Sequence, residues 1–169
     1  MEIEVPTTAE ERLVVVVGVD LSAISEHLLR TARRLIATAG EAELHVVHVV
    51  QPDALPLHLA GPVLTTDVDA LARAERAKQE LARLCTVITA GLNAHVFLYT
   101  LIGDAAEELT RVARSVKADI VVVEAHDRSG VSRLFHRSVV ARITRVAPCS
   151  VLTIRRRHEE APAAQAHAV

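Results

Sequence analysis

Aromatic residues are scarce in this chain: they make up 2% of its 169 residues, and tryptophan is absent. A hydrophobic core must therefore come from Val, Leu, Ile and Ala, and half of the residues are hydrophobic. Such a composition is typical of parallel sheets that are covered by helices. The length suits one domain with short tails.

The chain has little cysteine and little net charge. Its two cysteines, Cys85 and Cys149, exclude a disulfide-rich scaffold and indicate a reducing compartment. The formal net charge of -2 gives no reason to expect nucleic acid as a partner. The N-terminus lacks the apolar centre of a signal peptide, and the apolar runs are too short to span a membrane. We therefore expect a soluble, cytoplasmic protein that does not bind membranes.

Five short apolar runs, rich in β-branched residues, predict strands that are buried on both faces. They cover residues 13–19, 44–50, 94–101, 119–123 and 149–154.

Segments with helical spacing of apolar residues separate these strands. They cover residues 24–39, 67–90 and 104–116, and a last helix carries Val139, Ile143 and Val146. Ser22 is the expected N-cap of the first helix, and Asp104 with Glu107 resembles a capping box. Residues 51–66 contain three prolines without a period and predict a long surface loop.

These elements predict a single α/β domain over residues 12–155, with a flexible N-terminal tail (1–11) and a disordered C-terminal tail (156–169). Right-handed crossovers favour a doubly wound parallel five-stranded sheet of order 3-2-1-4-5, with helices on both faces. Ligands of such sheets bind where the strand order reverses, outside the carboxyl ends of the strands. That position lies between the loop that holds Asp20 and the loop at residues 124–138.

Three stretches, VVGVDLSAIS, GDAAEELTRVARSVKADIVVV and HDRSGVSRLFHRSVVARITRVAPCSVLTIR, resemble the universal stress protein family in order and spacing. The resemblance covers about residues 12 to 155. It implies the fold of adenine-nucleotide alpha-hydrolases and a role in stress response. If nucleotide binding is retained, it implies contacts from seven residues: Asp20, Val49, Gly103, His126, Arg128, Ser138 and Val139.

Many members of that family bind ATP through three glycines that let the backbone approach the phosphates. In this chain Glu124, Asp127 and Arg137 occupy the three glycine positions. A negative charge about 5 Å from a phosphate costs ~1–3 kcal/mol, and a bulky residue with positive φ adds ~1–2 kcal/mol of strain. Arg128, Arg133 and Arg137 keep the loop from repelling anions overall. We therefore expect ATP binding to be lost or greatly weakened, and no cofactor.

The leading interpretation is a non-enzymatic regulatory domain that acts through homodimerisation and an unknown protein partner. The alternative is an ATP- or AMP-binding protein, with magnesium and slow ATP hydrolysis. A phospho-receiver is disfavoured because its third strand should end in an acceptor Asp, and here it ends in Leu101.

Other polar residues have structural explanations. Asp20 could be a turn residue at a strand end. His45 and His48 are three apart in a strand and face opposite sides, so they cannot share a metal. His126 and His136 lack tight ligand spacing, and Cys85 lies on the apolar stripe of its helix. No metal site is expected.

The last strand is expected at one edge of the sheet, where neither proline nor charge before Arg155 blocks pairing. We expect it to pair with a second copy about a two-fold axis, as the resemblance also implies. Its interface residues would be Val151, Leu152, Ile154 and Arg155.

Overall fold

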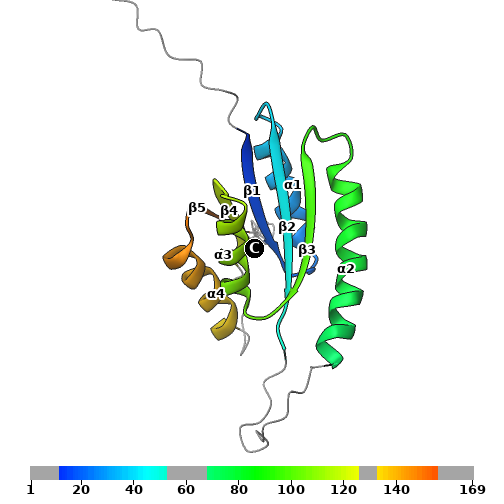
Figure 1. Cartoon of the computed structure of the whole chain (residues 1–169), viewed down its shortest axis with the longest axis vertical. Helices are drawn as coiled ribbons and strands as arrows, with labels where there is room; N and C mark the ends of the chain where they lie inside the picture. Colours follow the sequence, from blue (N-terminus) through cyan, green and yellow to red (C-terminus); the bar gives the residue numbers. More distant parts are fainter. Residues whose placement is uncertain (1–11, 53–67, 126–132, 156–169) are drawn as a thin grey trace, which may run out of the picture.

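The computed structural model describes residues 12–52, 68–125 and 133–155, with backbone alone at 68 and 133–138. Within them, a five-stranded sheet lies between two layers of helices (Figure 1). Its order is β3-β2-β1-β4-β5, and every neighbouring pair is parallel. The predicted fold class and strand order are confirmed. The strands are β1 (Leu13–Val19), β2 (Ala42–Val50), β3 (His95–Ile102), β4 (Ile120–Glu124) and β5 (Ser150–Ile154).

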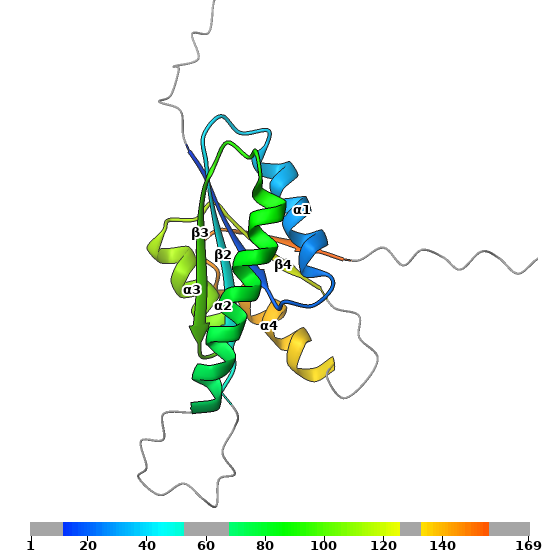
Figure 2. The ribbon, with the colours of Figure 1, turned by 90° about the vertical axis from the view of Figure 1, so that its right-hand side faces the viewer.

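Two helices cover each face of the sheet. The helices are α1 (Ser25–Ile36), α2 (Val68–Thr89), α3 (Ala105–Ser115) and α4 (Arg133–Val146). In Figure 2, α1 and α3 lie on opposite sides of the strands, and α2 crosses in front on the side of α1. This arrangement follows from the right-handed crossovers that parallel strands require.

The core forms on both faces because the buried strands are apolar on both sides. Val15, Val17 and Leu44 pack with α1 and α2, whereas Val14 and Val16 pack with α3 and α4. Cys85 is buried in the first of these clusters, as predicted, and burial raises the pKa of its thiol to about 11.

Gly18 lets α3 lie close to the centre of the sheet. A Cβ atom at this position would lie 2.8 Å from Cδ1 of Leu109, which is closer than packed carbon atoms tolerate. The missing side chain therefore brings the start of α3 near the carboxyl end of β1, where the candidate site lies.

The helix starts partly differ from the predictions. Ser22 is not the N-cap of α1, since the cap position is Ile24 and no side chain caps it. Asp104 does cap α3, but Glu107 pairs with Arg142 and does not complete a capping box. The expected loop at 124–138 is also too long, because α4 already begins at Arg133.

The expected tails at 1–11 and 156–169 lie outside the described residues, as does the expected loop at 51–66 from residue 53 onward. Among the residues that the structure describes, no helix is long and apolar enough to cross a membrane.

Candidate functional site

A cavity of about 670 Å³ opens at the carboxyl ends of β1, β2 and β4. It lies where the strand order reverses, as the predicted topology required. Asp20, Val49 and Val139 line it, so three of the seven predicted nucleotide contacts come together there. Its volume falls within the range of small-molecule pockets, roughly 300–1,000 Å³.

Asp20 lines the cavity and also builds the turn into α1. Its Oδ1 accepts hydrogen bonds from the Ser22 backbone N–H at 2.9 Å and from the Ser25 hydroxyl at 3.1 Å. The intervening Leu21 has a φ of 59°, which is a strained conformation for a branched side chain. Asp20 can therefore be both a turn residue and a ligand contact, because its carboxylate organises the turn and the residue lines the cavity.

The end of β2 supplies the opposite wall through His48, Val49 and Val50. Nδ1 of His48 donates to the Val19 carbonyl oxygen at 3.0 Å, which ties β2 to the end of β1. His45 does not line the cavity, and its ring stacks on Phe97 with ring centroids 4.7 Å apart. The two histidines do not share a site, and no metal-binding cluster occurs within the described ranges.

Glu124 ends β4 and lines the cavity, at the first of the three positions where the family's glycines would be expected. The described non-glycine residues with positive φ are Leu21 and Lys117, so the backbone strain considered for Glu124 is not present. Arg137 lies within α4, where the backbone is helical, so strain is not expected there either. What distinguishes Glu124 from glycine in this structure is its charge and its side chain.

Arg73 also lines the cavity, and it was not among the residues predicted from the sequence. It projects from α2, where its Nε donates to the Asp69 carbonyl oxygen at 3.4 Å. Ala70 and Ala77 are buried on the same helix, on either side of Arg73 in the sequence, but such a pattern indicates a packed helix and not a ligand contact.

Gly103 does not line the cavity but supports its wall. Its N–H donates to the Val50 carbonyl oxygen at 3.0 Å, and its φ is 155°. His126, Asp127 and Arg128 lie outside the described residues, and the side chain of Ser138 is not described. Of the expected phosphate loop, the structure therefore describes the side chain of Glu124 at the cavity wall.

The match to a protein family follows the same boundaries as the fold. The sequence profile of the universal stress protein family matches residues 12–155, which is most of the chain. This chain belongs to the universal stress protein family. No curated protein sequence matches it.

Solved structures of universal stress proteins share the fold. UspA from Lactobacillus plantarum superposes with a TM-score of 0.70 at 20% identity, over 85% of this chain and 97% of that one. A universal stress protein in complex with cAMP superposes with a TM-score of 0.61 at 23% identity, over 85% of this chain and 97% of that one. The universal stress protein from Archaeoglobus fulgidus in complex with dAMP superposes with a TM-score of 0.56 at 21% identity, over 86% of this chain and 99% of that one. At these identities the likeness establishes the fold, and the bound nucleotides belong to those two proteins.

Proposed function

We propose that this universal stress protein is a non-enzymatic regulatory domain of the cytoplasm. It acts through a homodimer and through contacts with a protein partner, and its nucleotide pocket has lost most of its affinity for ATP. The proposal keeps the cavity wall formed by Asp20 and Val49 and places the loss of affinity at Glu124, in the expected phosphate loop.

The observation that carries the proposal is the position of Glu124 at the cavity wall. Phosphate loops hold anions with backbone N–H groups, which requires small side chains and no competing negative charge. A carboxylate at about 5 Å from a phosphate disfavours binding by ~1–3 kcal/mol at effective dielectrics between those of water and a protein surface. That alone corresponds to a loss of roughly 5- to 150-fold in affinity.

The second candidate is a protein that binds ATP or AMP in an adapted pocket, with magnesium and slow ATP hydrolysis. Two observations favour it: the cavity of about 670 Å³ is open, and Arg73 brings a guanidinium to its wall. Arginine binds phosphate through paired N–H donors, so Arg73 could replace part of the glycine loop. The complexes of two relatives with cAMP and dAMP support the same candidate.

Calorimetric titration of the purified chain with ATP, ADP and AMP, with and without magnesium, separates the two candidates. We expect millimolar or weaker binding of ATP, and a submillimolar dissociation constant would overturn the leading proposal. Nucleotide that co-purifies with the protein would be visible as absorbance at 260 nm. The protein background there is low, because the chain has no Trp and one Tyr.

A further inference from the structure

A second hollow lies on the outer surface between α3 and α4, away from the nucleotide cavity. It has a volume of about 680 Å³, and we call it the arginine groove. Its walls carry Arg111 and Arg114 from α3 and Arg142 and Arg145 from α4. Four guanidinium groups in one groove are unusual in a chain whose formal net charge is -2.

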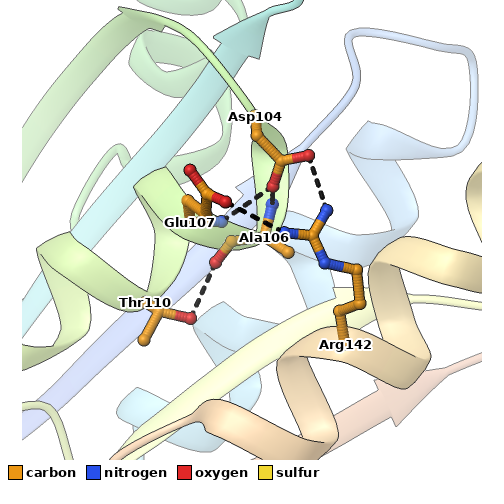
Figure 3. A network of polar contacts seen from close by, with 5 residues as sticks. All are labelled: Asp104, Ala106, Glu107, Thr110 and Arg142. Carbon is orange, nitrogen blue, oxygen red and sulfur yellow. Dashed lines mark hydrogen bonds and ion pairs between the residues drawn. The ribbon is translucent and has the colours of Figure 1, made fainter.

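Two of the four arginines are held by carboxylates at the start of α3. Arg111 pairs with Glu108, its neighbour on the helix. Arg142 donates to Asp104 at 2.7 Å and to Glu107 at 3.2 Å, and Figure 3 shows its guanidinium reaching from α4 to both. The Arg142 pairs connect α4 to the start of α3, whereas the Arg111 pair lies within α3.

The other two arginines have no carboxylate partner within the described ranges. Arg114 makes one long hydrogen bond, at 3.4 Å, to the Val146 carbonyl oxygen. Arg145 makes neither a hydrogen bond nor an ion pair in the part of the chain that the structure describes, and both side chains are exposed. Beside them Val146 leaves 47% of its surface exposed. At this end of the groove, the guanidinium groups of Arg114 and Arg145 and the apolar side chain of Val146 are therefore available to a partner.

The two available arginines come from opposite walls of the groove, Arg114 from α3 and Arg145 from α4. A third helix that lies between α3 and α4 can therefore present carboxylates to both walls. An amphipathic helix in a groove between two others is a common mode of peptide recognition.

We propose that the arginine groove binds an acidic amphipathic helix of a partner protein, with its carboxylates on Arg114 and Arg145 and an apolar residue on Val146. Nucleic acid is disfavoured because Asp104 and Glu107 would repel a continuous row of phosphates. The described groove residues also include no aromatic ring on which bases could stack. The inference rests on the proposed function in that it assigns a surface to the partner contact.

The test uses the full chain and a fluorescein-labelled alanine-based peptide with one leucine and with glutamates on a single helical face. A control peptide has the same composition, with the glutamates distributed around the helix. Fluorescence anisotropy at low salt should show binding of the first peptide, several-fold weaker binding of the second, and loss of affinity as salt rises.

Charge reversal then locates the site. The double substitution Arg114→Glu with Arg145→Glu should weaken binding at least about tenfold, because two attractions become repulsions. A matched control, Arg34→Glu with Arg83→Glu, changes exposed arginines of α1 and α2 by the same charge and should leave the affinity unchanged. Arg145→Ala gives a second test if the double variant is unstable. It removes a side chain without partners in the described structure and should weaken binding by roughly two- to fivefold.

Four results would overturn the inference: equal binding of both peptides, equal loss in the control variant, no loss in Arg145→Ala, or tighter arginine-dependent binding of single-stranded RNA. The chain's own N-terminal segment is the rival occupant, because Glu2, Glu4, Glu10 and Glu11 lie in it without a lysine or arginine. If the peptide binds only after these four are changed to Gln, the groove serves that segment and the partner proposal is wrong. Failure of peptide binding would leave the nucleotide titration unchanged, so the two proposals fail separately.

Discussion

Asp104 shows how one residue connects two helices. Its Oδ1 accepts hydrogen bonds from the backbone N–H groups of Ala106 and Glu107, each at 3.0 Å, and its Oδ2 accepts from Arg142 at 2.7 Å (Figure 3). Burial alone would raise the pKa of this carboxyl, but the hydrogen bonds from Glu107 and Arg142 outweigh it and lower the pKa below 3.8. The charged form is therefore the one that stabilises the start of α3.

We predict that Asp104→Ala lowers the free energy of unfolding at neutral pH by about 1–2 kcal/mol, since both the cap and the contact with α4 are lost. Asp104→Asn should cost less than half of that, because asparagine also caps helices but cannot pair ionically with Arg142. Urea denaturation monitored by circular dichroism measures both.

The pH dependence of the Asp104 effect has a definite sign. A carboxyl whose native pKa lies below its unfolded value of 3.8 contributes stability above that pH. The contribution is lost as the pH falls through the lower native pKa. The difference between the unmodified chain and Asp104→Asn should therefore shrink below pH 3.8, and a difference that stays constant in acid would contradict the assignment.

Glu124 provides the residue-scale test of the nucleotide pocket. Glu124→Gln keeps the length of the side chain and removes its charge, so ATP affinity should rise by roughly 5- to 150-fold. Glu124→Gly should raise ATP affinity by at least as much, because it removes the volume of the side chain as well as its charge. Glu80→Gln, at an exposed position of α2 outside the cavity, is the control for overall charge. Equal affinities in calorimetry for the chain and both Glu124 variants would exclude the charge as the obstacle.

At the scale of elements, the strands could be predicted because a buried parallel strand requires a continuous β-branched run, as in DIVVV and LVVVV. The start of α4 could not be predicted, because residues 133–138 (RLFHRS) lack a clear apolar stripe. The predicted start of α1 was wrong for a local reason. Asp20 accepts hydrogen bonds from the Ser22 N–H and the Ser25 hydroxyl, and Leu21 adopts a positive φ that its residue type does not indicate, so the helix begins after Ile24.

The candidate site was predictable in position but not in its full set of residues. The switch point follows from strand order, and it correctly places Asp20, Val49 and Val139 at one cavity. Arg73 was missed because it comes from α2. Tertiary packing brings this helix to the cavity, and the periodicity of the sequence does not specify that packing. Gly103 does not line the cavity, and its N–H holds the end of β2 through the Val50 carbonyl oxygen.

The end of α3 shows a conflict between sequence and backbone. Lys117 follows the C-cap Val116 with a φ of 53°, in the left-handed conformation that usually requires glycine. The Ala118 N–H donates to the Ala113 carbonyl at 2.9 Å and closes the turn. Gly91 has the equivalent conformation after α2, with a φ of 69° and open space where a Cβ atom would lie.

We therefore predict opposite effects at these two helix ends. Lys117→Gly should raise the free energy of unfolding by about 0.5–1 kcal/mol, because it removes left-handed strain. Gly91→Ala should lower it by about the same amount, for the converse reason. Thermal and urea denaturation of the two variants beside the unmodified chain measure both effects. A stability loss in Lys117→Gly would mean that the lysine side chain contributes more than its backbone costs.

At the scale of the whole molecule, the sheet ends in two edge strands with which no other described strand pairs. β5 ends one side, and Leu152 on it leaves 39% of its surface exposed. β3 ends the other side, where Leu98 leaves 42% exposed and Phe97 is similar. Neither strand contains a proline or an acidic residue, so both edges are open to pairing with another chain. This property was predicted from the sequence for the last strand but not for the third.

The proposed dimer uses β5, because a short edge strand can pair with its own copy about a two-fold axis, with Val151, Leu152, Ile154 and Arg155 at the contact. Leu152→Asp places a charge in the middle of that edge and should convert the dimer to a monomer. Leu98→Asp is the matched control, since it changes a leucine of almost equal exposure on the other edge and should leave the dimer intact. Light scattering at micromolar concentration measures the mass of each variant. Dissociation by Leu98→Asp alone would place the interface on β3, and a monomeric unmodified chain would exclude edge pairing altogether.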